Sequence, residues 1–190
     1  MTYSAKLALF GAFVSVLSGA VAVSSEQARA GATQPDTTEV RIGTAYHGYE
    51  GREAGTVDVS LDALLPAFDL GKSLSSDAFS LHPQIGIDVN TQGKTSAAFA
   101  GFAAVVHLPA NFKIEADLGG SINNGKATSE SDTGRSELGC TTLFREAFGI
   151  GYQATKEVSL MAVAEHMSNA NLCTPNNGIT NFGLKLGYSF

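Results

Sequence analysis

The chain has 190 residues, of which 44% are hydrophobic and 16% are charged, and its formal net charge is −6. This length allows one domain of ordinary size, and the hydrophobic content excludes a disordered tail. The acidic balance, without a dense Lys/Arg cluster, argues against nucleic acid as a partner. The two cysteines are too few for a disulfide scaffold and form no CxxC pair, so structural zinc is not expected.

The N-terminal segment has the composition of a secretory signal peptide. Lys6 precedes an apolar run over residues 7–23, and the small-residue sequence Ala28-Arg29-Ala30 provides a cleavage site. We expect residues 1–30 to be removed and residues 31–190 to form the mature domain. An uncleaved anchor is the alternative, but the run contains Gly and Ser and falls short of the ~20 apolar residues that a membrane helix needs. Export would bring the cysteines to a compartment where a disulfide can form.

The rest of the chain alternates between apolar and polar residues with a period of two, which is typical of strands with two different faces. The last segment carries large apolar side chains on one face and ends in Phe190, whereas its other face is small or polar. Similar segments fall near residues 39–50, 55–68, 79–92, 95–108, 112–124, 140–154, 157–170 and 178–190. Their length and alternation suit a wall between lipid and a polar lumen. The sequence therefore predicts an all-β fold, an eight-stranded antiparallel transmembrane β-barrel closed on itself.

The connections can be assigned to two sides once both termini are placed in the periplasm. Residues 109–111 and 155–156 are expected to form short periplasmic turns, and residues 125–139 and 171–177 extracellular loops. Side chains fill a lumen of eight strands, so we expect no diffusion pore. The sequence contains neither a phosphate loop nor metal-ligand spacing among its histidines, so no cofactor and no metal are expected.

The end of the seventh segment combines two residues that can perform chemistry. His166 and Ser168 lie two positions apart and therefore share a face with the apolar Ala164, which is the lipid face. Polar side chains at a lipid boundary are costly and for that reason indicate function. A serine beside a histidine is the minimal unit for acyl transfer, because the hydroxyl needs a base to become a nucleophile. The alternative is a histidine and a serine that merely lie at the membrane interface.

The segment His166-Met167-Ser168-Asn169-Ala170 and the residues after it resemble the PagL-type lipid A 3-O-deacylases, small outer-membrane barrel esterases. Asn171-Leu172, Pro175-Asn176, Gly178 and the terminal strand belong to the same match, and weaker similarity covers most of the mature chain. The resemblance implies a Ser-His-acid triad on the outer surface of the barrel. It also implies a location in the bacterial outer membrane, lipid A of lipopolysaccharide as the substrate in the outer leaflet, and no cofactor.

Residue by residue, the resemblance gives Ser168 the position of the nucleophile and His166 that of the general base. Asn169 matches the asparagine that the family links to the oxyanion hole. The family's glutamate corresponds to Thr180 here, which has the right facing but cannot carry the charge that stabilises an imidazolium. The acid must therefore come from elsewhere, or catalysis is weakened or lost. A homodimer is compatible with the sequence.

Strand geometry offers a substitute acid. A turn at residues 155–156 pairs Glu146 of the sixth segment with His166 on the lipid face. The same register brings Cys140 next to Cys173, so a disulfide between them is expected, and it would contribute about 3–4 kcal/mol in the chain-entropy model. Because two independent features favour one register, we prefer Glu146 as the acid. Glu165 is nearer in sequence but points into the lumen, where Arg145 is its expected partner.

Two functions from different classes follow. The first is an esterase that removes the ester-linked 3-O acyl chain from lipid A, with Ser168, His166 and Glu146 as its triad. The second is a non-catalytic outer-membrane barrel, a surface or structural protein that keeps the scaffold without a complete triad. Thr180 at the acid position supports the second, and Glu146 opposite His166 supports the first.

Overall fold

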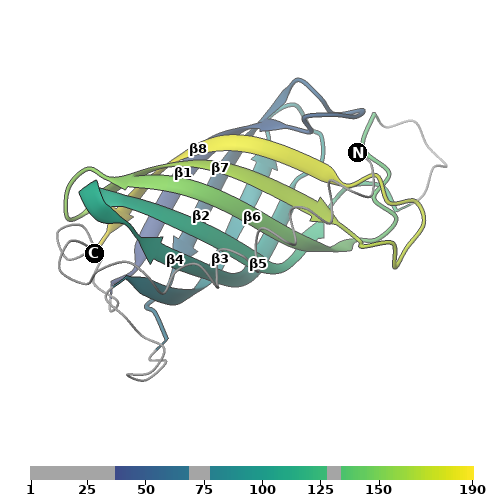
Figure 1. Cartoon of the computed structure of the whole chain (residues 1–190). Coiled ribbons are helices and arrows are strands. Elements are labelled where there is room, and N and C mark those ends of the chain that lie inside the picture. Colours follow the sequence, from purple (N-terminus) through teal and green to yellow (C-terminus); the bar gives the residue numbers. More distant parts are fainter. Residues whose placement is uncertain (1–36, 69–77, 128–133) are drawn as a thin grey trace.

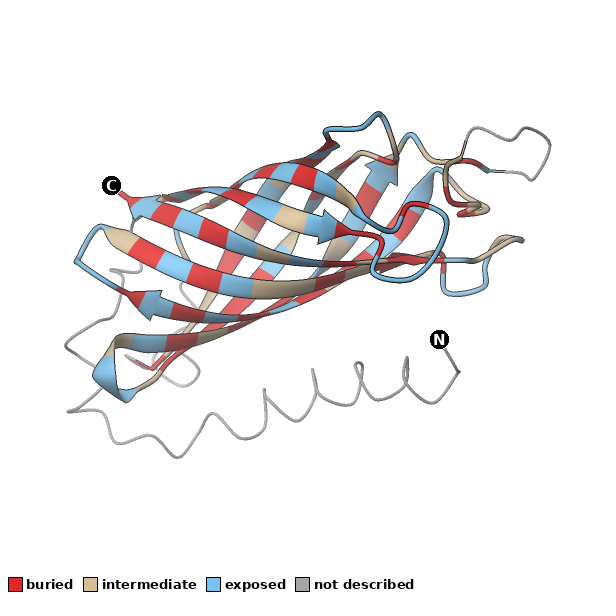
Figure 2. Ribbon diagram, turned by 90° about the horizontal axis from the view of Figure 1, so that it is seen from above, coloured by how far each residue is buried: buried red, intermediate tan, exposed pale blue. Residues whose placement is uncertain are grey.

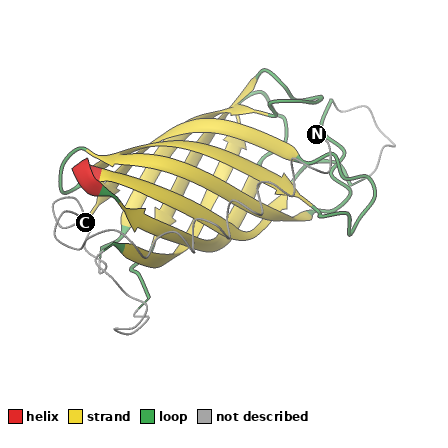
Figure 3. Cartoon of the chain, in the orientation of Figure 1, coloured by secondary structure: helices red, strands yellow, loops and turns green. Residues whose placement is uncertain are grey.

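The computed structural model describes residues 37–68, 78–127 and 134–190. The predicted signal peptide, residues 1–30, lies outside them. No helix among the described residues is long and apolar enough to cross a membrane. Their helical structure is a short 3-10 turn, Pro109–Asn111, which joins two strands at the end of the barrel where the C-terminus lies (Figure 3).

Eight strands form a closed antiparallel sheet in which each strand pairs with its neighbours in chain order and the last pairs with the first (Figure 1). The strands are β1 (Glu39–His47), β2 (Thr56–Leu64), β3 (Phe79–Asn90), β4 (Ala97–His107), β5 (Phe112–Asn123), β6 (Thr142–Gln153), β7 (Val158–Ser168) and β8 (Ile179–Ser189). Closure gives every strand a partner on both sides, which a lipid environment requires of backbone polar groups. The predicted eight-stranded antiparallel barrel is confirmed.

Each strand lies within its predicted range and is shorter at one or both ends. The early ends of β7 and β1 have a cause in the backbone. β7 ends at Ser168 because the chain turns at Ala170 and Asn171, whose φ angles of 52° and 67° do not fit a strand. β1 ends at His47 because Gly48 has a φ of 60°. Periodicity alone does not reveal where such turns begin.

The two ends of the barrel differ in the length of their connections. The connections after β1, β3, β5 and β7 leave one end, which we call the loop end. The connections after β4 and β6 leave the opposite end, which we call the turn end, and span only residues 108–111 and 154–157. The connections after β4 and β6 agree with the predicted short turns, whereas the connection after β2 leaves the same end and spans residues 65–78.

Buried and more exposed side chains alternate along most of the barrel wall, as the banding in Figure 2 shows, whereas the last five residues of β4 are all buried. The outer face is apolar, with large side chains such as Ile122 and Leu184 exposed to 60% and 68%. The inner face holds the charged residues, and Arg41 and Arg145 are 1% and 2% exposed. This is the reverse of a water-soluble domain and matches a barrel with lipid outside and a polar interior.

Several of the interior charges form ion pairs, because an unpaired charge in a water-poor interior is costly. Arg41 donates two hydrogen bonds of 2.6 and 2.7 Å to the carboxylate of Glu115. Nε of Arg145 donates to Glu165 over 2.7 Å, which is the pair expected from the sequence. These side chains are buried inside the barrel, and the absence of a diffusion pore stays a prediction.

The interior changes character near the loop end. Five buried apolar side chains form a cluster there: Ala97, Leu138, Leu143, Met167 and Ile179. Leu138 belongs to the connection between β5 and β6 and is fully buried. Met167 stands between His166 and Ser168 in the sequence but faces inward. The strand that carries the predicted site is therefore packed from behind by an apolar core.

Candidate active site

Three neighbouring strands, β6, β7 and β8, carry the predicted site on the outer face of the barrel. His166 of β7 is paired with Glu146 of β6 on one side and with Thr180 of β8 on the other. Ser168 follows two residues later on the same face, opposite Phe144. The register between β6 and β7 is the predicted one. Because directly paired side chains have Cβ atoms about 4.5–5.5 Å apart, Glu146, His166 and Thr180 form a row across the sheet.

The imidazole of His166 is half-buried and is held in a defined orientation. Its Nδ1 forms a hydrogen bond of 2.8 Å with Oγ1 of Thr180. Gly178 lies against the ring, since a Cβ built on it would stand 3.0 Å from Cε1 and 3.2 Å from Nε2 of His166. Gly178 has a φ of 56°, a conformation that favours glycine. A hydrogen bond at Nδ1 and bare backbone near Nε2 thus constrain the ring.

Thr180 and Glu146 differ in what they can offer this histidine. A threonine hydroxyl can orient an imidazole, but it cannot supply the negative charge that stabilises an imidazolium. Glu146 has a carboxyl group that can supply this charge, is half-buried and occupies the paired position on the same outer face. The structure brings both residues to His166, and the role of Glu146 as the acid stays a prediction.

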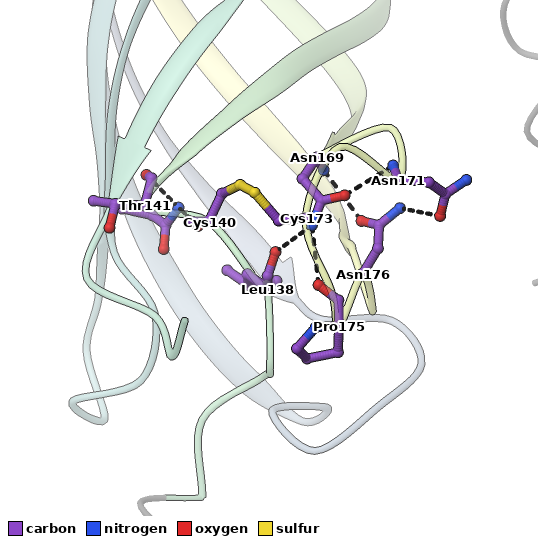
Figure 4. The surroundings of a disulfide bond; sticks show 9 residues. Leu138, Cys140, Thr141, Asn169, Asn171, Cys173, Pro175 and Asn176 are labelled. Atoms are coloured by element: carbon purple, nitrogen blue, oxygen red, sulfur yellow. Dashed lines mark hydrogen bonds between the residues drawn. A yellow bond between two sulfur atoms is a disulfide. The ribbon is translucent and has the colours of Figure 1, made fainter. Parts of the chain in front are cut away.

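Asn169, the residue after Ser168, is buried and engaged by backbone groups. Its Nδ2 donates to the carbonyl oxygens of Leu138 and Pro175 over 2.7 and 3.0 Å (Figure 4). Its Oδ1 accepts a hydrogen bond of 2.8 Å from the backbone N–H of Asn171. Because both Nδ2 hydrogens are engaged, the side chain braces the loop rather than offering a free donor. A link from Asn169 to an oxyanion hole stays a prediction. With both Nδ2 hydrogens engaged, Asn169 would contribute by positioning backbone N–H groups of the loop.

The backbone after Asn169 adopts a conformation that is unusual for residues other than glycine. Ala170 and Asn171 have φ angles of 52° and 67°. Such residues cost on the order of 1–3 kcal/mol each and persist where the surroundings enforce them, often at functional sites. Within the described part of the chain, the backbone N–H of Ala170 donates no hydrogen bond. A backbone donor is therefore available two residues after Ser168.

Cys140 and Cys173 are joined by a disulfide, as the sequence predicted, with their Cα atoms 5.9 Å apart. The bond links the connection between β5 and β6 to the connection between β7 and β8, next to Asn169 (Figure 4). Sequence reasoning did not single out Leu138, Gly139 or the packing role of Gly178. The position of Gly139 directly before Cys140 is the one signal that could have pointed to a close approach of two loops.

A second histidine lies inside the barrel at the loop end. Nδ1 of His47 is 2.6 Å from Asp58 and its Nε2 is 2.9 Å from Glu53, and all three residues are 1% exposed. Glu53 also accepts hydrogen bonds from the backbone N–H groups of Thr95 and Ser136, so it ties three loops together. Burial alone would raise the pKa of Glu53, but the bonds from His47 and from these backbone groups lower it to about 2.

The described residues contain no group of three or more His, Cys, Asp or Glu that could hold a metal ion. The strands β6, β7 and β8 and the turn after Ser168 hold a hydroxyl, an imidazole, a carboxylate and a backbone N–H. These are the parts that acyl transfer to a serine requires.

Comparison with solved structures supports the fold. The crystal structure of the outer membrane enzyme PagL shares 19% identity with this chain at a TM-score of 0.58, covering 79% of this chain and 98% of that one. A de novo designed transmembrane β-barrel follows, with 14% identity, a TM-score of 0.52 and coverages of 83% and 98%. The N-terminal β-barrel domain of Pseudomonas aeruginosa OprF has 14% identity, a TM-score of 0.50 and coverages of 82% and 98%.

Curated protein sequences yield no match to the chain. The homodimer that the sequence left open finds no support in these comparisons. A model of one protein family, described as lipid A 3-O-deacylase (PagL), matches residues 37–189, which include every strand of the barrel. The chain therefore belongs to the lipid A 3-O-deacylase (PagL) family of outer-membrane hydrolases.

Proposed function

We propose that this protein is an outer-membrane serine esterase that removes the ester-linked 3-O acyl chain from lipid A of lipopolysaccharide. The observation that carries the proposal is the row of Glu146, His166 and Thr180 beside Ser168 on the outer face of the barrel. A site on this face is reached from within the outer leaflet, where lipid A resides. The substrate would thus arrive laterally and would not have to enter the packed lumen.

The reaction proceeds by acyl transfer to Ser168. Thr180 forms a hydrogen bond with Nδ1 of His166, and Nε2 takes the proton from the hydroxyl of Ser168 as Oγ attacks the ester carbonyl. The oxyanion that forms is stabilised by backbone donors in the turn after Asn169, with the N–H of Ala170 as the candidate. The bond between the carbonyl carbon and the sugar oxygen breaks, and the imidazolium returns its proton to that oxygen. A water molecule, deprotonated by His166, then cleaves the acyl-serine and releases the fatty acid.

Two residues share the task of the missing glutamate in this proposal. Thr180 orients the imidazole, and the carboxylate of Glu146 stabilises the imidazolium from the opposite strand. A conventional triad acid does both, because it accepts the Nδ1 hydrogen bond and carries the charge. The division explains how the family reaction can continue with a threonine at the family's acid position.

The outer side chains of β7 between His166 and the turn end suit the binding of an acyl chain. Ala164 and Ala162 continue the outer face of β7, and both are short. Larger side chains flank them, Phe148 and Phe182 on the two sides of Ala164, and Ile150 and Leu184 on the two sides of Ala162. We place the acyl chain along these two alanines, with its ester at Ser168. The outer face of β7 thereby leads from the nucleophile toward the middle of the membrane.

Mass spectrometry of lipid A from cells with and without the protein tests the proposal. Cells that express the protein should yield lipid A that lacks one ester-linked hydroxyacyl chain, whereas cells expressing Ser168→Ala should not. Both barrels should reach the outer membrane in equal amounts. Unchanged lipid A in the presence of correctly folded wild-type protein would instead favour a non-catalytic surface barrel, for which Thr180 at the acid position is the specific argument.

A further inference from the structure

A short segment outside the triad lies against the residues that follow Ser168. This segment, Leu138–Cys140, closes the connection between β5 and β6 and is called here the clamp segment. Leu138 is fully buried and packs in the apolar cluster with Met167, the residue between His166 and Ser168. The clamp segment is therefore anchored behind the strand that carries the site.

Gly139 shows how closely the two loops approach. A Cβ built on Gly139 would stand 1.9 Å from the carbonyl oxygen of Pro175 and 2.8 Å from Nδ2 of Asn169. Its φ of 75° is also one that favours glycine. The two backbones thus meet with no room for a side chain between them, and any other residue would push the loops apart.

Two further links fix the same approach (Figure 4). On one side of Gly139, the carbonyl oxygen of Leu138 accepts the hydrogen bond of 2.7 Å from Nδ2 of Asn169. On the other side, Cys140 is bonded covalently to Cys173. A hydrogen bond, a backbone contact and a disulfide from three successive residues all reach the turn after the nucleophile.

That turn needs an external support, because Ala170 and Asn171 both have left-handed backbone conformations. Asn169 transmits the support, since its Nδ2 is held by the clamp segment while its Oδ1 accepts from the N–H of Asn171. The connection runs from Leu138 through one side chain to the backbone that carries the N–H of Ala170.

We propose that Leu138, Gly139 and Cys140 are positioning residues for the esterase reaction, which fix the turn at Ala170 through Asn169 so that its N–H meets the oxyanion. This inference rests on the proposed function. It assigns the disulfide a role in the chemical step beyond holding the barrel together. None of the three residues touches the substrate.

A double-mutant cycle tests this role. The double variant Cys140→Ser/Cys173→Ser and the variant Gly139→Ala should each lower kcat by about 10- to 100-fold, because a small misplacement of a transition-state donor has an effect of that size. KM should change less than kcat. In an Asn169→Ala background the same changes should cost almost nothing further. Losses that simply multiply, or variants with full kcat, would overturn the proposal.

The matched control is Arg135→Gln, which loosens the same loop at a different point. Arg135 donates hydrogen bonds to the carbonyl oxygens of Gly93 and Asn124, and neither bond involves Asn169 or the clamp segment. Its kcat should stay at the wild-type value. A drop equal to that of Gly139→Ala would show that general loosening of the loop is sufficient, which contradicts a specific role of the clamp segment.

Hydrogen exchange separates this inference from the function on which it rests. The backbone N–H of Asn171 should exchange faster in Gly139→Ala and in Cys140→Ser/Cys173→Ser, with the strands of the barrel still protected. If exchange is faster in these variants but the wild-type protein has no esterase activity, the clamp segment does support the turn but has no catalytic role. If the wild-type protein is an active esterase but exchange is unchanged in the variants, the clamp segment does not support the turn, and the proposed function still stands.

Discussion

His47 and His166 are both found at the loop end of the barrel, yet their surroundings are opposite. His47 lies inside, 1% exposed, between the carboxylates of Asp58 and Glu53 at 2.6 and 2.9 Å. His166 lies on the outer face, half-buried, with a threonine hydroxyl on Nδ1 and Ser168 two residues away. Two carboxylates stabilise the protonated form of His47, so His47 would be the stronger base if only its hydrogen-bond partners mattered.

In the proposed mechanism, access from the membrane decides which of the two histidines can act as the base. Both nitrogens of His47 are occupied by carboxylates, and the interior around it is packed, so neither a nucleophile nor a lipid can reach it. His166 lies on the outer face of the barrel, the side from which an acyl chain would arrive in the proposed mechanism. We therefore propose that His47 contributes to stability and His166 to catalysis, and the following substitutions test that division.

The same substitution at both histidines should give the largest contrast. His166→Gln should lower kcat by about 10⁶-fold, the size of loss seen on removing a triad histidine in soluble serine hydrolases. His47→Gln should leave kcat per folded molecule unchanged and lower the thermal unfolding temperature, because it removes a partner of two buried carboxylates. Ester hydrolysis in detergent and thermal unfolding measure the two effects. The reverse result would exchange the roles of the two residues.

Removal of the outer carboxylate should have the next largest effect. Glu146→Ala should lower kcat by about 10⁴-fold, as expected for the acid of a triad. Adding Thr180→Glu to this variant should restore activity, since it returns a carboxylate to the position of the family's acid. Glu157→Ala, at an exposed glutamate near the turn end, is the control and should be silent. Full activity of Glu146→Ala would leave a Ser-His dyad as the better description.

Crowding of the outer histidine should have a smaller effect. Gly178→Ala brings a methyl group to 3.0 Å from Cε1 of His166, so the ring must shift. A loss of about 10²-fold in kcat is expected for a displacement of this kind. Gly93→Ala separates crowding from backbone strain, because Gly93 also has a positive φ but has nothing within 4 Å of the position that the methyl group would take. Equal losses in both variants would show that the ring is not sensitive to this contact.

Substitution of Ala164, next to His166 on the outer face of β7, should change the selectivity for acyl-chain length more than the rate. Ala164→Phe fills the short position between Phe148 and Phe182, where we place the acyl chain. Hydrolysis of long-chain esters should fall by about 10-fold relative to short-chain esters, which is typical for a pocket contact with a hydrocarbon chain. Ala100→Phe makes the same change on the outer face of β4 and should not alter the ratio. An unchanged ratio in Ala164→Phe would place the chain elsewhere.

Substitution of Glu53, the partner of the interior histidine His47, should affect stability and its pH dependence, with no effect on kcat. Glu53→Gln should cost on the order of 1–3 kcal/mol at neutral pH, because it weakens the hydrogen bonds that the buried carboxylate accepts. The pKa of Glu53 is lowered from 4.5 to about 2 in the folded protein, so its contribution is complete above pH 4.5 and disappears as the pH falls toward 2. The unfolding temperatures of wild type and Glu53→Gln should therefore converge in acid. A constant difference down to pH 2 would contradict this assignment.

The sequence by itself determined the barrel and much of the site. Alternation with a period of two separates a lipid face from a lumen face without any tertiary information, because side chains of a strand point to opposite sides. The register between β6 and β7 also followed from the sequence, since a short turn and a fixed parity leave few pairings. That register brought Glu146 opposite His166 and Cys140 near Cys173, as the structure has them.

Only the tertiary structure decided how these residues are held. The contact of Gly139 with Pro175, the bracing of Asn169 by Leu138 and the left-handed turn at Ala170 join segments that are about thirty residues apart in the chain. The bond from Thr180 to Nδ1 of His166 likewise depends on side-chain rotamers that a pairing register leaves open. Periodicity acts along one strand, whereas these contacts depend on where two loops meet at the end of a closed barrel, and that position is set only when all eight strands have paired.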